Sequence, residues 1–154
     1  MWIEKREKEQ YSDCKCHGLR LVFYEGFSQE DVAEIKDFCR WLTKVYWFPI
    51  RCYILFVHTK NFRAEDGHTY YGIFYPNDEC KRKTYPRVCV AAQADNSNDE
   101  DFRLFCIAHE LTHYFQWYFL EDEEKSQRSR EIMASRWANY IVWQYKNRNN
   151  KGML

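Results

Sequence analysis

The segment IAHELTHYF, residues 107–115, places His109, Glu110 and His113 among apolar and aromatic neighbours. Residues four apart on a helix lie on one face, one turn above another, so both imidazoles can point at a common site. Burying three ionisable groups without partners is costly, and a metal ion bound by both imidazoles removes that cost. The segment therefore predicts a metal site on a buried helix; the alternative is two core histidines that bond to neighbouring groups.

The spacing of these residues is that of the H-E-x-x-H pattern, in which the glutamate acts as a general base. Zinc accepts imidazole nitrogen at about 2.0–2.1 Å, and two such ligands fit the pitch of a helix. Glu110 is rotated to the side of that point, where it would reach a water rather than the metal. We predict that His109 and His113 bind Zn²⁺ and that Glu110 is the catalytic base.

A catalytic zinc has three protein ligands and one open position. A third histidine in the metzincin extension is excluded, because Gln116 and Phe119 stand where that extension has glycine and histidine. No histidine follows His113, so the third ligand is a downstream carboxylate or comes from upstream. The downstream candidates are Glu121, Asp122, Glu123, Glu124 and Glu131.

Glu131 is the candidate we favour. The first four carboxylates fall in a charged connection, whereas Glu131 is predicted to lie on the last helix. Ala134 and Ala138 follow it at helical spacing, and such small side chains let two helices approach closely. The alternative is an ordinary glutamate near a helix start, where the helix dipole favours negative charge.

Hydrophobic periodicity along the chain predicts a single α+β domain over residues 1–154, with 1–17 and 147–154 as flexible ends. Strands are expected at 19–24, 51–58, 68–75 and 87–92, and helices at 29–46, 102–120 and 127–145. The segments 61–67 and 93–101 are expected to be loops, with a turn at 76–78. The result is a small mixed sheet of about four strands with one helix before it, an HELTH helix after it, and a C-terminal helix bearing Glu131.

Local features are predicted at three places within this scheme. Ser28, with Asp31 three residues on, is expected to cap the first helix, and Ser97 or Asn98 the second. Gly72, inside a predicted strand, indicates a bulge or a place where another group approaches the backbone closely.

Composition excludes some functions. The chain has 23 basic and 23 acidic residues, so a strongly positive surface for nucleic acid is not expected. No apolar run reaches the roughly 18 residues that a membrane span needs, and no secretory signal is visible. Seven cysteines, an odd number, favour reduced thiols in the cytoplasm over a disulfide framework. Cys14, Cys16 and His17 are either half of a second metal site or ordinary residues before the first strand; Cys106 is expected to be an inert buried thiol.

HELTH followed by REIMASRWA, residues 130–138, resembles the gluzincin class of HExxH zinc metallopeptidases. The similarity is to small intracellular and phage-borne domains of the IrrE/ImmA type and covers about residues 98–145. Glu131, Ala134 and the pair Trp137–Ala138 match the pattern of that family's glutamate helix. The resemblance implies a zincin-like fold in which the strand nearest the cleft holds the substrate as an added strand. Thermolysin-like gluzincins carry aspartate where this chain has Ser135.

The expected function is therefore that of a zinc-dependent peptidase, which hydrolyses a peptide or protein with a metal-activated water and Glu110 as the base. The alternatives are a metal-bound regulatory or protein-binding module, against which Glu110 argues, and hydrolysis of a non-peptide amide. A further group should stabilise the oxyanion. The sequence leaves five candidates open: Tyr70, Tyr71, His68, His58 and Tyr140.

Overall fold

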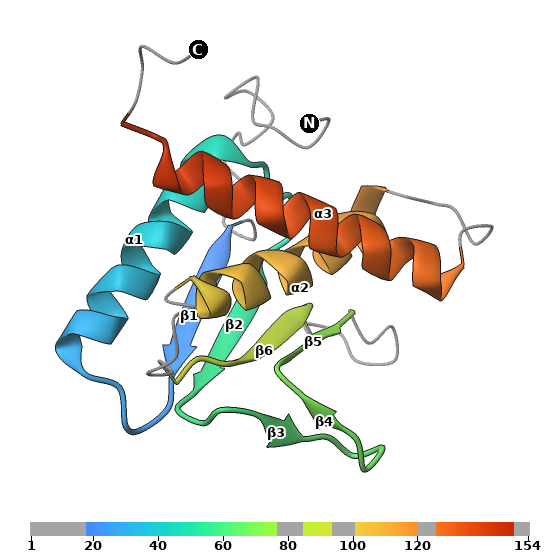
Figure 1. Cartoon of the computed structure of the whole chain (residues 1–154), viewed down its shortest axis with the longest axis horizontal. Helices are drawn as coiled ribbons and strands as arrows, with labels where there is room; N and C mark the ends of the chain where they lie inside the picture. Colours follow the sequence, from blue (N-terminus) through green and yellow to red (C-terminus); the bar gives the residue numbers. More distant parts are fainter. Residues whose placement is uncertain (1–17, 77–84, 94–100, 120–125, 150–154) are drawn as a thin grey trace.

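The structure, a computed structural model, describes residues 18–76, 85–93, 101–119 and 126–149 (Figure 1). Its elements, in chain order, are β1 (Leu19–Phe23), α1 (Gln29–Val45), β2 (Cys52–Val57), β3 (Phe62–Arg63), β4 (Thr69–Tyr70), β5 (Gly72–Tyr75), β6 (Arg87–Ala91), α2 (Phe102–Phe119) and α3 (Gln127–Lys146). The α+β class is confirmed, the predicted strands at 19–24, 51–58 and 87–92 match β1, β2 and β6 to within a residue, and the three helices end within a residue of their predicted ends.

Four strands form one mixed sheet in the order β1-β2-β6-β5. β1, β2 and β6 are parallel, and β5 runs antiparallel to β6 at the edge. Leu21, Ile54, Val88 and Phe74 lie opposite one another across the sheet and form one apolar row. The nearly continuous apolar run of β2 is explained by its interior position, as predicted.

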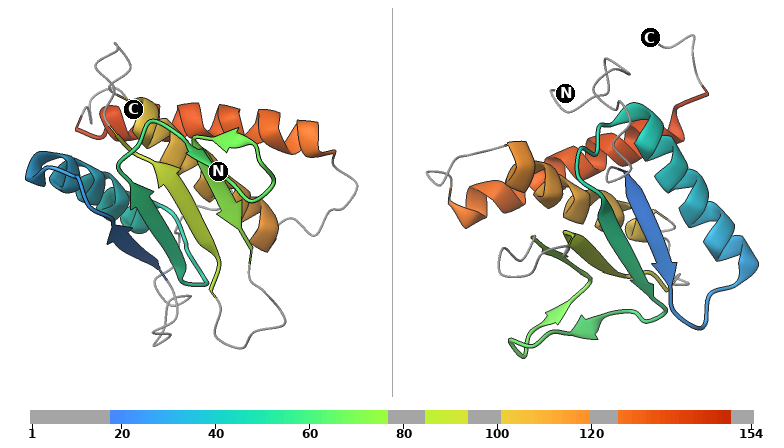
Figure 2. Two further views of the ribbon diagram at one scale, coloured as in Figure 1. Left: turned by 90° about the horizontal axis from the view of Figure 1, so that it is seen from below. Right: turned by 180° about the vertical axis from the view of Figure 1, so that it is seen from behind.

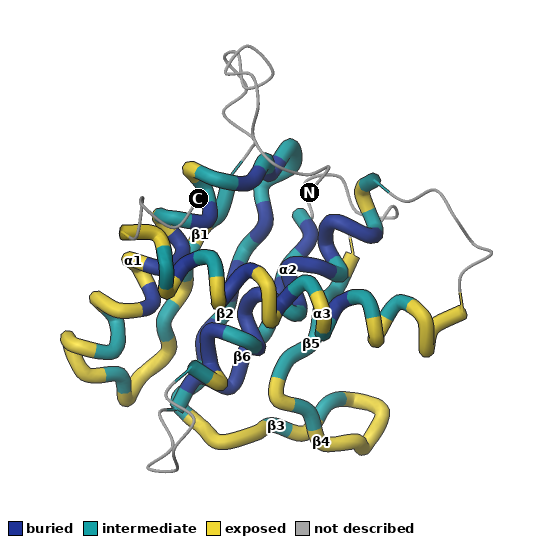
Figure 3. Tube along the Cα trace, turned by 45° about the horizontal axis from the view of Figure 1, so that its top comes forward, coloured by how far each residue is buried: buried dark blue, intermediate teal, exposed yellow. Residues whose placement is uncertain are grey.

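The helices cover one face of this sheet (Figures 1 and 2). In β2, residues at alternate positions (Cys52, Ile54, Phe56) are buried, as the period of a strand with one covered face requires. α2 packs against β5 and β6 and also against α3, so it is enclosed on two sides. This enclosure explains why α2 is apolar nearly all round, and Figure 3 shows buried residues concentrated in β2, β6 and α2.

The prediction for residues 61–75 is wrong in part. β3 and β4 form a separate antiparallel hairpin inside the segment predicted to begin with a loop, and the predicted strand 68–75 is broken at Tyr71. Polar contacts between neighbouring residues stabilise the hairpin turn. The residues that make these contacts are of types equally common in loops, so the sequence did not reveal the hairpin. The His68 amide donates to Asp66 Oδ1 at 2.9 Å, and Arg63 Nε donates to the Gly67 carbonyl at 3.0 Å.

Side chains and backbone groups mark the helix starts. Ser28 Oγ accepts from the Asp31 amide at 3.1 Å, which confirms the predicted cap of α1. α3 begins in the same way, with Ser126 Oγ accepting from the Ser129 amide at 3.1 Å. The Asp101 carbonyl accepts from Phe105 at the start of α2; residues 97 and 98, predicted to cap this helix, lie outside the described residues.

Among the described residues, no helix combines the length and the apolar character that a membrane crossing requires. The four described cysteines, Cys39, Cys52, Cys89 and Cys106, are all free thiols.

Candidate metal centre

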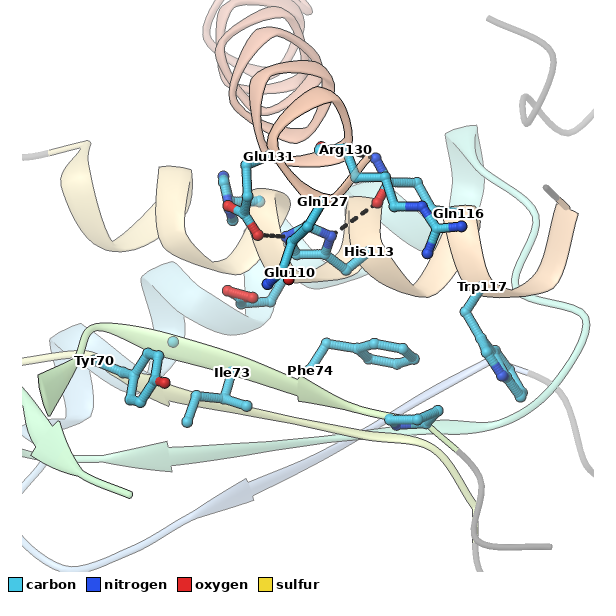
Figure 4. A pocket seen from close by; sticks show the side chains of 13 residues that line it. Tyr70, Ile73, Phe74, Glu110, His113, Gln116, Trp117, Gln127, Arg130 and Glu131 are labelled. Atoms are coloured by element: carbon cyan, nitrogen blue, oxygen red, sulfur yellow. Dashed lines mark hydrogen bonds and ion pairs between the residues drawn. The ribbon is translucent and has the colours of Figure 1, made fainter. Parts of the chain in front are cut away.

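His109 and His113 lie one turn apart on the face of α2 that turns toward α3, with their ring centres 5.0 Å apart. Both meet the same carboxylate. His109 Nε2 lies 3.0 Å from Glu131 Oε2, and His113 Nε2 lies 2.9 Å from Glu131 Oε1. The three residues that the sequence predicts as ligands are therefore brought together from two helices. Figure 4 shows Glu131 of α3 beside His113 of α2.

Glu131 reaches the histidines because α3 packs directly on α2. Ala134 and Ala138, one and two turns further along, are completely buried between the helices. Larger side chains at these positions would separate the helix axes and withdraw the carboxylate from the imidazoles. Glu131 keeps half of its side-chain surface exposed, so the site opens to solvent on this side.

The buried Gln116 side chain, one turn after His113, holds its imidazole in one orientation. Gln116 Nε2 donates to the Arg130 carbonyl at 3.0 Å, so the amide oxygen must face the other way. That oxygen lies 2.8 Å from His113 Nδ1 and can only accept a hydrogen bond. Nδ1 is therefore a donor to Gln116, and Nε2 is the ring nitrogen of His113 that faces Glu131.

The second imidazole, that of His109, has a weaker support. Its Nδ1 lies 3.5 Å from Ser135 Oγ. Ser135, which stands where thermolysin-like gluzincins have aspartate, is thus the residue beside this imidazole. Burial, and next the neighbouring His113, lower the pKa of His109. A lowered pKa keeps this imidazole neutral at pH 7, and the neutral form is the one that binds a metal.

These contacts test whether a metal fits. The Nε2 atoms of both imidazoles lie at hydrogen-bond distance from one carboxylate, a space that either a ring proton or a metal ion can occupy. Ligands of a tetrahedral zinc at about 2.0–2.1 Å are separated from one another by about 3.3 Å. The observed separations of 2.9 and 3.0 Å are a few tenths of an ångström shorter, and small side-chain shifts accommodate the ion. The donor set thus fits a divalent metal.

Glu110 also belongs to this cluster. Atoms of His109, Glu110 and His113 that can bind a metal lie within 4.8 Å of one another, so these three residues could hold an ion by themselves. Glu131 is the closer carboxylate, at 2.9 and 3.0 Å from the two imidazoles. Of the two carboxylates, Glu131 thus makes the direct contacts with both imidazoles, and Glu110 lies beside them.

The buried Glu110 side chain lies in close contact with β5. Burial, and next the negative charge of Glu131, raise the pKa of Glu110 to about 8. A methyl group added at Gly72 would lie 2.8 Å from Glu110 Cγ and 3.2 Å from its Oε2. The predicted close approach at Gly72 is thus confirmed, and the approaching group is the predicted base.

The residues of this centre line a cleft of about 870 Å³. One wall comes from the edge strand β5, with Ile73 and Phe74, and the other from the first turn of α3 (Figure 4). Trp117 lies at the end of the cleft beyond Gln116, where its ring centre is 6.0 Å from that of Phe74. The cleft therefore has a polar centre at the histidines and an aromatic end.

Of the five candidates for oxyanion stabilisation, only Tyr70 lines this cleft. Its hydroxyl donates to Asp66 in the hairpin. His58 packs against Phe27, with ring centres 4.9 Å apart, and Tyr71 packs against Phe102 at 5.2 Å. The remaining two candidates, His68 and Tyr140, are absent from the lining.

Other predictions concern residues around the centre. Burial raises the pKa of Cys106 to about 12, which agrees with an inert thiol. The alternative carboxylates Glu121, Asp122, Glu123 and Glu124, and the Cys14, Cys16 and His17 group, lie outside the described residues.

Comparison of the chain with protein-family models, with curated proteins and with solved structures gave no match. The interpretation of the centre therefore depends on its own geometry.

Proposed function

We propose that the chain is a zinc-dependent peptidase with a zincin-like fold. The observation that carries the proposal is the convergence of His109, His113 and Glu131, with separations of 2.9 and 3.0 Å, beside the buried carboxylate of Glu110. Two imidazoles and one carboxylate are a ligand set of hydrolytic zinc sites, which keep a further position open. The half-exposed Glu131 side of the site allows such a position.

The residues of the chain have separable roles in this proposal. His109, His113 and Glu131 hold the ion, which when bound lowers the pKa of a water toward about 7 and polarises a carbonyl. Glu110 takes a proton from the attacking water on a carboxylate oxygen and returns it to the leaving amine nitrogen. A cation at the imidazoles favours the ionised form of Glu110, which burial alone opposes.

The substrate would lie along β5. This strand pairs with β6 on one side, and in the described part of the chain its other edge has no strand partner. A peptide added to a free strand edge gains main-chain hydrogen bonds whatever its sequence. Because Ile73 and Phe74 of β5 line the cleft opposite Glu131, such a peptide would pass the metal ligands. These features support a peptide or protein substrate over a small amide.

A purely regulatory metal module is the competing function. A structural metal site has no use for a buried carboxylate beside its ligands, and keeping Glu110 there is unfavourable because its pKa is raised to about 8. The position of Glu110 therefore favours hydrolysis.

Metal analysis combined with a peptide library tests the proposal. The purified wild type should contain about one zinc per chain and cleave library peptides, and a chelator should abolish cleavage. Glu110→Gln should keep its zinc and lose cleavage, whereas His113→Ala should lose both. Undiminished cleavage by Glu110→Gln contradicts the assigned base, and a zinc-loaded wild type that cleaves nothing supports the regulatory module.

A further inference from the structure

A second groove, of about 540 Å³, lies between the start of α2 and the last turns of α3. Its lining combines apolar side chains of both helices with one amide and two charges: Phe102, Phe105, Val142, Trp143, Asn139, Asp101 and Lys146. Lys146 Nζ and Asp101 Oδ1 form an ion pair at 2.7 Å, so the groove presents no net charge. We call it the aromatic groove.

Exposed rings surround the aromatic groove. Phe102 is 37% exposed and Trp143 is 55% exposed. Two further exposed rings pack against these two. Tyr71, 53% exposed, packs edge-on against Phe102, and Tyr140, 42% exposed, stacks on Trp143 at 6.2 Å between ring centres. Contiguous exposed rings indicate a binding surface, and tryptophan and tyrosine contribute strongly to binding energy.

The aromatic groove adjoins the cleft at the metal centre, because Phe105 of the groove packs against His109 of the cleft. Phe102, Phe105 and His109 follow one another along one face of α2, and the rings of Phe105 and His109 lie 5.7 Å apart. Tyr71 directly precedes Gly72, the first residue of β5. The helix that carries the histidines, α2, and the strand β5 thus both lead toward the groove, and a polypeptide lying along β5 would meet these rings after passing the histidines.

We propose that the aromatic groove is a second binding surface for the polypeptide substrate and takes an apolar, ring-bearing segment on one side of the scissile bond. This inference rests on the proposed peptidase function. The paired charges of Asp101 and Lys146 leave nothing to attract a charged ligand, whereas the rings offer large contact area to apolar side chains. Recognition therefore extends beyond the cleft, and longer substrates are preferred.

Kinetics with extended peptides test the proposal. The shortest peptide cleaved from the library is lengthened at either end, in turn, by Phe-Leu-Trp-Leu or by Ser-Gly-Ser-Gly. At one end only, the aromatic extension should raise kcat/KM about tenfold over the Ser-Gly extension, mainly through KM. The ratio of kcat/KM for the aromatic extension to kcat/KM for the Ser-Gly extension should fall below about threefold in Trp143→Ala and in Phe102→Ala. Tyr24→Ala, which removes an exposed ring directly after β1 at the far edge of the sheet, should keep the full ratio.

An equal ratio in Trp143→Ala and the wild type, or no gain from either aromatic extension, overturns the proposal. A binding measurement separates this failure from failure of the proposed function. Fluorescein-labelled dodecapeptides with an alanine-glycine core and the same extensions are titrated onto zinc-loaded Glu110→Gln. If the wild type cleaves no peptide, preferential binding of the aromatic dodecapeptide that Trp143→Ala removes still supports the groove, and equal binding of both dodecapeptides overturns it. A dimer that Trp143→Ala converts to a monomer in light scattering also overturns it, because the groove is then a contact between copies.

Discussion

Replacing Gly72 by alanine should disable the predicted base while leaving the metal ligands in place. The new methyl carbon would lie 2.8 Å from Glu110 Cγ, whereas carbon atoms in contact prefer about 3.5–4.0 Å. The overlap is therefore about 1 Å, and either β5 or the Glu110 side chain must move. The backbone of residue 72 is ordinary strand, so the substitution introduces no other conformational strain.

The expected cost follows from this overlap. Overpacking of a well-filled site costs about 1–3 kcal/mol, and the loss of chain entropy in the unfolded state returns about 0.4–1 kcal/mol. A net destabilisation of about 1–2 kcal/mol is expected, which lowers the midpoint of thermal unfolding by about 2–8 °C. Displacement of a catalytic group by about 1 Å should reduce kcat/KM about 100-fold.

Urea denaturation, zinc content and peptide hydrolysis of Gly72→Ala measure these effects. The sharpest control is the same substitution in a Glu110→Ala background, where the methyl group meets empty space instead of the glutamate. The destabilisation should then disappear, so the double-mutant cycle should show a coupling of about 1–2 kcal/mol. If Gly72→Ala lowers the free energy of unfolding equally with and without the Glu110 side chain, then contact with Glu110 is not the reason for glycine at position 72.

Three further substitutions make separate predictions. Gln116→Ala removes both the acceptor for His113 Nδ1–H and the donor to the Arg130 carbonyl, so zinc affinity measured by chelator competition should fall about 10–100-fold; unchanged affinity contradicts the positioning role. Glu131→Gln should weaken zinc binding and abolish the thermal stabilisation that zinc gives the wild type in calorimetry. If that stabilisation persists, another residue is the third ligand. Burial opposes ionisation of Asp31, but the hydrogen bond and positive charge of Arg103, together with smaller contributions from Ser28 and His58, outweigh it and lower the pKa of Asp31. Asp31→Asn should therefore cost about 1–2 kcal/mol at pH 7 in urea denaturation, and the difference should shrink below pH 3.8 as wild-type Asp31 is protonated; an equal difference at pH 7 and pH 3 contradicts this.

Much of the fold could be predicted because its signals are local. The ends of α1 follow from the Ser28 cap and from periodic apolar positions, and the central place of β2 follows from its apolar run. The order of the strands and the antiparallel direction of β5 could not be predicted, because they depend on contacts between distant segments. The hairpin of β3 and β4 escaped prediction since its turn is held by polar side chains that are equally common in loops.

The candidate site divides in the same way. The positions of His109, Glu110 and His113 relative to one another are determined by the helix alone, so the sequence was sufficient to group them. The position of Glu131 depends on the packing of α3 against α2. The sequence signal for that packing was the pair of small residues after it, Ala134 and Ala138. Gln116 was missed as a supporting residue, although an amide three residues after His113 on an otherwise apolar helix was a usable signal.

Since two helices that pack side by side supply the ligands, the number of residues between HELTH and the glutamate does not determine the geometry of the centre. Insertions and deletions in the connection between α2 and α3 should therefore accumulate during evolution without separating Glu131 from the two histidines. A search pattern with a fixed spacing would overlook such descendants. A pattern that requires HExxH and then, at any distance, a helix with Glu followed by Ala at the third and seventh positions would retain them.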